Sequence, residues 1–296
     1  MAQKDLKSRI GSVKNIQKIT RAMEMVAAAR LRRAEQRIEH LRPYAGAIRR
    51  MTRQAAAAAE NIPSLPILQE HEQERRVGLV LVTGDRGLAG AFNSQILRAG
   101  LRAAAEHEGA GHEVAYYASG KRGVSSLTFR GLQLDGSYTG FTDRPGYANA
   151  REIAEQVMSA YVDGDLDRVE IFYNGYISPL TQEVRRETLL PLQQATILEA
   201  QDEDEKDTGH HALVEYEPDP EQILQRLIPD YVEISVFRAL LESTASEHGA
   251  RMTAMRSASD NAGELIESLT LQMNRARQAE ITQEIMEVVA GAEALG

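Results

Sequence analysis

The feature that most constrains this chain is a long C-terminal stretch without proline. Pro229 is the last proline, so residues 230–296 contain no residue that breaks a helix. Because a proline inside a helix costs about 3 kcal/mol, this stretch favours one continuous helix. At about 1.5 Å per residue, such a helix would be roughly 90 Å long, which is more than one compact core can bury. We therefore expect a second helix beside it and a larger partner around it.

The spacing of small and apolar residues within this stretch predicts how the helix packs. They recur in alternating steps of three and four, at Met255, Ala258, Ala262, Leu265, Leu269, Met273 and Ala276. A repeat of about 3.5 residues is typical of a coiled coil rather than of a helix that lies on a sheet.

The N-terminal region predicts a second long helix. One apolar stripe comprises Leu6, Ile10, Val13, Ile16, Ile19, Met23 and Val26, and it resumes at Leu31, Ala34, Ile38, Leu41, Ala45 and Ile48. This spacing predicts a helix over about residues 3–58, with a bend near Pro43. Its length makes it the natural antiparallel partner of the C-terminal helix.

The middle of the chain has the pattern of a globular domain. Short apolar runs predict strands at 77–83, 113–119 and 168–173, with further strands at 183–191 and 212–217. Helices are predicted at 91–107, 124–129 and 147–161 between them. The predicted fold class is α/β, in which a long antiparallel coiled coil of N- and C-terminal helices carries an inserted Rossmann-like α/β domain. The predicted divisions are an N-terminal helix at 1–60, the Rossmann-like α/β domain at 61–218 and a C-terminal helix at 219–296.

Composition and charge exclude several classes of protein. The chain has no cysteine, so it can form neither a disulfide nor a cysteine-based zinc site. No apolar run reaches the roughly 20 residues of a membrane span, and the N-terminus has no signal-peptide core. The net charge is −9, yet residues 1–53 are strongly basic. A basic helix on an acidic protein indicates a partner with a complementary surface, although a solvated charged face has the same pattern.

Motifs for catalysis or cofactor binding are weak. Gly84, Gly87 and Gly90 form a turn between a strand and a helix, but their spacing matches neither a dinucleotide fingerprint nor a P-loop. This turn could be an anion site or purely structural, and Asp85 favours the structural turn because its charge would repel phosphate. The run at 118–123 lacks the remaining residues of a P-loop.

The residues alone leave three more interpretations open. His210 and His211 follow the acidic loop 202–207 and could ligate a metal, although adjacent histidines are usually only exposed. The basic N-terminal helix could bind nucleic acid, but residues 1–43 lack aromatic side chains for base stacking. The coiled coil could simply be a dimerisation rod.

The composition of the helix ends argues against a plain rod. Residues 281–294 are small or apolar on nearly every side, whereas an exposed coiled coil keeps its outer face polar. Arg275, Arg277, Glu280 and Glu284 add separate polar positions to the same helix. These residues predict a tip that another protein encloses.

Several segments resemble one known family over essentially the whole chain. IQKITRAMEMV at 16–26 is similar to the opening signature of the gamma subunits of F-type ATP synthases, and SEHGARMTAM at 246–255 and NRARQAEITQEIMEVVAGA at 274–292 are similar to the closing one. DRGLAGAFN at 85–93 resembles the family's glycine turn, with Ala89 where cysteine is common.

The resemblance implies a non-catalytic central shaft that turns inside a hexamer of alternating alpha and beta subunits. It implies contacts with the epsilon subunit and the ring of c subunits, no cofactor, nucleotide or metal site, and a peripheral position on the cytoplasmic side of a bacterial inner membrane. By the same resemblance, the rotor–stator contacts are expected at Met23, Arg277, Gln278, Thr282 and Glu284. A basic face toward beta is expected at Arg9, Lys18, Arg21, Arg30, Arg32 and Arg33. A dimeric scaffold with a Rossmann-like head and an enzyme with a ligand at the glycine turn are the rival interpretations.

Overall fold

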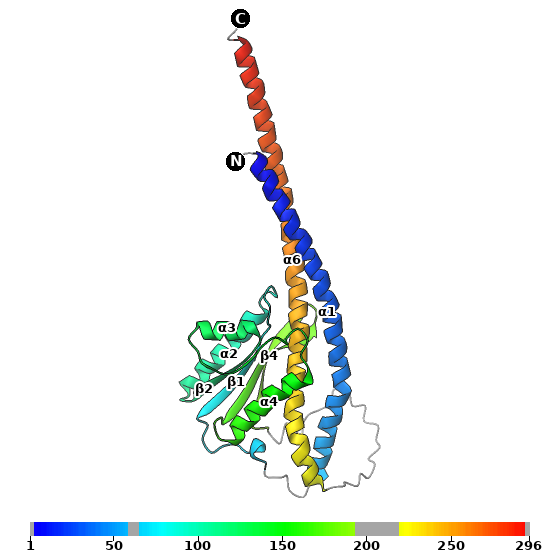
Figure 1. Cartoon of the computed structure of the whole chain (residues 1–296), viewed down its shortest axis with the longest axis vertical. Helices are drawn as coiled ribbons and strands as arrows, with labels where there is room; N and C mark the ends of the chain where they lie inside the picture. Colours follow the sequence, from blue (N-terminus) through cyan, green and yellow to red (C-terminus); the bar gives the residue numbers. More distant parts are fainter. Residues whose placement is uncertain (1–2, 59–64, 193–218, 294–296) are drawn as a thin grey trace. The chain divides into compact units, whose positions relative to one another are not determined.

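The computed structural model describes residues 3–58, 65–192 and 219–293 (Figure 1). Two helices, α1 at Gln3–Ala58 and α6 at Pro220–Glu293, contribute to both of its compact units. Unit 1 comprises Met1–Ala28 and Arg251–Gly296, and unit 2 comprises Ala29–Ala250. The boundaries between the two compact units therefore lie inside α1 and α6. The predicted divisions instead follow the ends of those helices.

The α/β part of unit 2 is built on one five-stranded sheet in the order β3-β2-β1-β4-β5. Its strands are β1 (Arg76–Val82), β2 (Glu113–Ser119), β3 (Leu134–Tyr138), β4 (Arg168–Ser178) and β5 (Thr181–Leu190). β1 to β4 pair in parallel, and β5 pairs antiparallel with β4. The connecting helices are α2 (Phe92–Gly109), α3 (Lys121–Phe129) and α4 (Tyr147–Val162), and a short 3-10 helix, η1, spans Pro66–Leu68.

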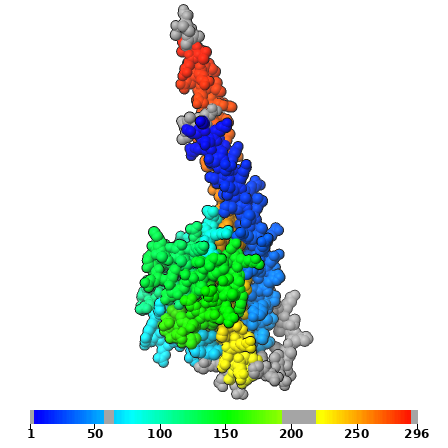
Figure 2. Space-filling model, viewed as in Figure 1, coloured from blue at the N-terminus to red at the C-terminus, as the bar shows by residue number. Residues whose placement is uncertain are grey.

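Helices cover both faces of this sheet (Figure 1). Along β1, Leu79 and Leu81 pack toward α2 and α3, whereas Val80 and Val82 pack toward α4 and α6. Burial on both faces explains why β1 reads as a continuous apolar run rather than an alternating one. On the second face, the Tyr147 and Phe237 rings of α4 and α6 meet edge to face at 5.6 Å, and Figure 2 shows green α4 beside the yellow start of α6.

The predicted α/β fold is confirmed, with differences in detail. Strand β3 was not predicted, because LDGSY contains Asp135 and Gly136 and lacks an apolar run. It forms as an edge strand held by its pairing with β2. β4 extends beyond its predicted end into a hairpin with β5. The strand predicted at 212–217 lies outside the described residues.

The long helices match their predicted ranges and continue through their internal prolines. α1 continues through Pro43, and α6 begins at Pro220 and continues through Pro229. A proline in the first turn of a helix loses no hydrogen bond, because the amides there have no partner inside the helix. Around Pro229 the helix is held by packing, since Leu224, Ile228 and Val232 are fully buried in the core that the sheet, α4 and α6 share.

In unit 1, α1 and α6 pair antiparallel, as predicted. Leu6 and Ile10 pack against Leu269 near the start of α1, and further along α1 the Gln17 side-chain amide donates to the carbonyl oxygen of Ser259 at 3.3 Å. Beyond that, Glu24 forms an ion pair with Arg256 at 2.8 Å. In unit 2 the same two helices pair through Ala45 and Ile48 with Leu227 and Ile234.

The predicted seam was wrong at four positions. Ile16, Ile19 and Val26 of α1 and Leu265 of α6 are exposed. The residues that follow the strict heptad are Gln17 and Thr20 on α1 and Ser259 and Ile266 on α6, and these are buried or half-buried. Hydrophobicity misled the prediction because these polar side chains reach hydrogen-bond partners: Gln17 bonds across the pair, and the Thr20 hydroxyl donates to the Gln17 carbonyl.

Candidate functional site

The first candidate surface is an apolar patch on the α1 half of unit 1. Ile16, Ile19, Met25 and Val26 are each more than half exposed. They are exposed because they lie outside the heptad seam, whose positions Gln17 and Thr20 occupy. Ile16, Ile19 and Val26 lie within about 80° of one another around the helix, whereas Met25 faces another side. An exposed apolar strip of this kind marks a place where another macromolecule binds.

The second candidate surface is the end of α6. Ile281, Ile285, Met286, Val288 and Val289 are exposed, and Val288 is the most exposed of them at 72%. Successive residues of a helix are about 100° apart, so these side chains lie within one arc of about 160°, and Glu284 and Glu287 lie on the other side. This face is wider than the narrow seam that one neighbouring helix covers, so a larger partner surface fits it.

The predicted contact residues lie on the same unit. Met23 is half-buried on α1, whereas Arg277, Gln278, Thr282 and Glu284 are exposed on α6. The Thr282 hydroxyl donates to the Gln278 carbonyl oxygen at 2.9 Å, within the helix. The four α6 side chains are therefore accessible beside the apolar end of the helix.

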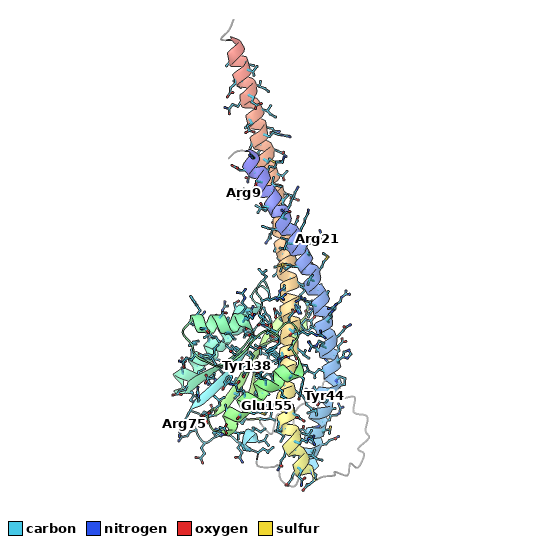
Figure 3. The ribbon with its side chains drawn as sticks, viewed as in Figure 1. Arg9, Arg21, Tyr44, Arg75, Tyr138 and Glu155 are labelled. Atoms are coloured by element: carbon cyan, nitrogen blue, oxygen red, sulfur yellow. The ribbon has the colours of Figure 1, made fainter. Side chains whose placement is uncertain are left out.

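The predicted basic face divides between exposed surface and internal contacts. Arg9, Lys18 and Arg21 are exposed on α1 in unit 1, and Figure 3 shows Arg9 and Arg21 projecting from that helix. In unit 2, Arg32 and Arg33 are exposed in the same way. The sixth predicted residue, Arg30, is half-buried and forms an ion pair with Asp143.

Arg30 is held within the chain. Its guanidinium donates to both carboxylate oxygens of Asp143, at 2.5 and 2.6 Å. Arg30 is therefore tied by an ion pair to the loop that precedes α4. The same loop accepts a hydrogen bond from Arg37 at the carbonyl of Pro145. Both contacts tie this loop to α1 inside unit 2.

The glycine turn after β1 is closed by the chain's own carboxylate. Asp85 accepts hydrogen bonds from the backbone amides of Lys121 at 3.0 Å, Gly140 at 2.9 Å and Thr142 at 3.2 Å, and from the Thr142 hydroxyl at 3.0 Å. Burial alone would raise the pKa of Asp85, but these donors outweigh burial and hold the pKa below its usual range. Asp85 thereby connects the glycine turn to the start of α3 and to the loop before α4.

Neither a membrane helix nor a metal cluster is found in the described ranges. No helix there is both long and apolar enough to cross a bilayer. Over the same residues, no three His, Cys, Asp or Glu side chains come close enough to hold a metal ion. The histidine pair at 210–211 and the acidic loop at 202–207 lie outside these ranges.

Sequence reasoning missed one set of buried polar residues. On α6, Ser243, Thr244, Ser246, Glu247 and His248 are all at most 4% exposed. A usable signal was present, because small and polar residues replace the apolar stripe here without a proline or a loop. Burial of such a run requires hydrogen-bond partners on every side.

Comparison with known proteins shows one family over nearly the whole chain. The model of the ATP synthase family matches residues 2–295. The ATP synthase gamma chain of Rubrobacter xylanophilus is 45% identical over 292 residues, which cover 99% of this chain and 98% of the relative. The gamma chain of Moorella thermoacetica is 43% identical with the same coverage.

The solved structures that this chain resembles also come from ATP synthases. The central stalk and c-ring structure of Tetrahymena thermophila mitochondrial ATP synthase contains a chain with a TM-score of 0.60 and 28% identity, covering 81% of this chain and 99% of that one. A chain in the OSCP/F1/c-ring structure of Euglena gracilis mitochondrial ATP synthase has a TM-score of 0.68 at 19% identity and covers 99% and 94%; it supports the fold alone. Together with the full-length match to curated relatives, these findings show that this chain belongs to the family of ATP synthase gamma chains.

Proposed function

We propose that unit 1 is the part of this rotor subunit that lies inside a hexamer of alternating alpha and beta subunits. The observation that carries this proposal is the apolar end of α6, where Ile285, Met286, Val288 and Val289 are exposed on one broad side of the helix. An enclosing collar of subunits is the partner that such a surface fits. The exposed patch around Ile16 and Ile19 fits contacts with the beta subunits.

The mechanism follows from the asymmetry of this surface. One side of α1 is apolar, whereas Lys18 and Arg21 make another part basic. A rotor with different sides has a different contact free energy with each of the three beta subunits, and rotation changes which one it favours. Shifting a two-state equilibrium from 1:99 to 99:1 requires about 5.5 kcal/mol.

The exposed side chains can supply a free energy of this size. Burying a large apolar side chain completely is worth about 1.5–3 kcal/mol, so one that is half exposed can contribute about 1 kcal/mol to a new contact. A handful of such contacts, gained and lost in turn, reaches the required magnitude. We place the coupling residues at Met23, Arg277, Gln278, Thr282 and Glu284, and the basic contacts at Arg9, Lys18, Arg21, Arg32 and Arg33. Arg30 is left out because Asp143 already binds it.

The remaining partners complete the rotor. We propose that the α/β part of unit 2 contacts the epsilon subunit and the c-ring, and that the complex lies on the cytoplasmic side of a bacterial inner membrane. ATP-driven or proton-driven rotation then passes between the c-ring and the beta subunits through this chain. Nucleotide chemistry belongs to the beta subunits, in keeping with a glycine turn in which the Asp85 carboxylate is bound by the amides of Lys121 and Gly140.

Reconstitution tests this function. The purified chain is mixed with alpha and beta subunits, and both complex formation and magnesium-dependent ATP hydrolysis are measured. We expect one copy per three alpha–beta pairs and activity only in the complex. A chain that remains apart as a coiled-coil dimer would overturn the proposal.

A variant tests the enclosed surface itself. Changing Ile285, Met286 and Val289 to serine should weaken assembly without unfolding the isolated chain, because these side chains are exposed there. Phe129→Ser is the matched control, since Phe129 is 92% exposed on α3 of unit 2. Equal effects of the triple variant and this control on assembly would contradict the proposed surface.

A further inference from the structure

The sheet of unit 2 has a topological switch point, the place where sheets of this class bind ligands. From β1 the chain moves to β2 and β3 on one side, and it then returns to β4 on the other side of β1. In open α/β sheets of this kind, ligands bind outside the carboxyl ends of the two strands where the order reverses. Here that position lies beyond β1 and β4, beside the turn that begins at Thr83.

Helix α6 occupies this position. The Ser246 hydroxyl donates to the carbonyl oxygen of Asn174, in β4, at 3.0 Å. Glu247 packs on the turn after β1 so closely that a Cβ added to Gly84 would lie 2.7 Å from its carboxyl carbon. Two residues of α6 thus contact β4 and the turn after β1, at the two strands that define the switch point.

The loop before α4 closes the position from another side. The Thr244 hydroxyl lies 2.9 Å from the carbonyl oxygen of Thr142 and 2.8 Å from that of Leu240, so it shares its proton between the loop and its own helix. The His248 ring nitrogen Nε2 lies 3.5 Å from the Asp143 carboxylate. This loop is fixed in turn by Asp85, which binds the amides of Gly140 and Thr142.

The β4–β5 hairpin completes the enclosure. Arg185 of β5 pairs with Glu242 of α6 at 3.1 Å. At the hairpin turn, a Cβ added to Gly249 would lie 3.0 Å from the carbonyl oxygen of Pro179. The segment from Glu242 to Gly249 is therefore surrounded by a turn, a strand, a loop and a hairpin, which explains why its polar residues are buried.

We propose that the switch-point crevice is a socket in which α6 takes the place of a small-molecule ligand. In this socket, Thr244, Ser246 and Glu247 are positioning residues that prevent α6 from rotating about its own axis relative to the α/β domain. This inference rests on the proposed rotor function. It adds the place where torque passes between the α/β domain and the helix.

The chemistry of the socket suits this task. Apolar contacts are non-directional, so they resist rotation of a helix only through the shapes of the packed side chains. Hydrogen bonds are directional, and a buried group that loses its partner costs about 1–3 kcal/mol. Because Thr244, Ser246 and Glu247 face different sides of the helix, any rotation of α6 breaks several contacts at once.

The first experiment removes the directional bonds and keeps the shape. The double variant Thr244→Val with Ser246→Ala is assembled into the complete ATP synthase in vesicles, and ATP hydrolysis and ATP-driven proton pumping are measured together. We expect hydrolysis to persist while the ratio of pumping to hydrolysis falls severalfold, because α6 slips in its socket. An unchanged ratio would overturn the inference.

The control is a matched pair of hydroxyl deletions outside the socket. Ser235 and Thr270 donate to the carbonyl oxygens of Tyr231 and Ile266, within α6 itself. Ser235→Ala with Thr270→Val should leave the ratio unchanged. Should the double socket variant fail to assemble, the single change Ser246→Ala carries the same comparison. Failure of the unmodified chain to assemble would instead count against the proposed function.

The converse experiment locks the socket. The chain contains no cysteine, so Thr142→Cys with Thr244→Cys allows one disulfide between the loop and α6. Because we infer that this joint does not move during rotation, the oxidised complex should retain its coupled activity. Activity lost on oxidation and restored on reduction would show that α6 moves in the socket and would refute the inference.

Discussion

Replacing Asp85 by alanine tests the architecture of the glycine turn most directly. The change removes the one carboxylate that connects this turn, the start of α3 and the loop before α4. The amides of Lys121, Gly140 and Thr142 then lose their common acceptor. We expect the loop to loosen, and the socket around α6 with it, while the core between sheet and helices remains packed.

The magnitude follows from these bonds. A buried hydrogen bond to a charged group contributes about 1.5–3 kcal/mol. Asp85 is half-buried, and its four bonds share one carboxylate, so water replaces part of what is lost. We therefore expect Asp85→Ala to lower the free energy of unfolding of unit 2 by about 2–3 kcal/mol. Asp85→Asn keeps one acceptor oxygen and should lower it by about 1 kcal/mol.

The pH dependence gives an independent check. Burial acts to raise the pKa of Asp85, but the amide donors prevail and the pKa in the folded chain is lowered. A carboxylate with a lowered folded pKa stabilises the protein above its unfolded pKa of about 3.9. That contribution is lost as the pH falls through the folded pKa. The difference between the natural chain and Asp85→Ala should be full at neutral pH and should shrink under more acidic conditions.

Hydrogen exchange is the suitable assay, because it reports on the loop separately from unit 1. Exchange at the amides of residues 120–143 is compared for the natural chain and the variant at several pH values. Asp163→Ala is the control, since the side chain of Asp163 accepts an exposed hydrogen bond from Ser159. The reasoning fails if both variants exchange alike, or if the effect of Asp85→Ala persists undiminished in acid.

Three further changes test packing and coupling. Gly100→Ala should destabilise unit 2 by about 1–3 kcal/mol in denaturant unfolding, because the added Cβ would lie 2.4 Å from a methyl carbon of Leu81; normal stability would contradict this packing. Gln17→Leu should break the bond to Ser259 yet change thermal stability by less than about 1 kcal/mol, because an apolar residue suits a seam position; a large loss would show that the polar seam is essential. Met23→Lys should lower proton-driven ATP synthesis more than hydrolysis, because a new cation adds a contact that differs between beta states, and equal losses would argue against this.

Local sequence patterns were sufficient for the long helices and most of the sheet. The absence of proline and the three-four spacing depend on residues near in sequence, so α1 and most of α6 were predictable. Continuous apolar runs revealed β1 and β2 for the same reason. β3 was missed because its only support is pairing with β2, and pairing between distant segments leaves no trace in a five-residue sequence.

The functional surfaces were only partly predictable. The apolar end of α6 was visible in the sequence, because an excess of apolar residues needs no knowledge of partners. The outward position of Ile16 and Ile19 was not, since a stripe of steps three and four can be drawn through either these residues or Gln17 and Thr20. Likewise, Asp85 could be seen to repel an anion, but its donors come from Lys121 and from a loop more than fifty residues away.

In unit 1, the choice of which α1 residues are buried and which are exposed is therefore not the one that stability alone would favour. A helical pair that served only its own stability would bury Ile16 and Ile19 and expose Gln17 and Thr20. Here Gln17 and Thr20 can occupy the seam because each forms a hydrogen bond within the helical pair. The exposed isoleucines can then each contribute about 1 kcal/mol of burial free energy to a contact with a partner. In unit 2 the same helix α6 has the opposite arrangement, with polar residues bonded to the socket on every side. Unit 1 is thus suited to contacts that are made and broken as the rotor turns, and unit 2 to contacts that do not change.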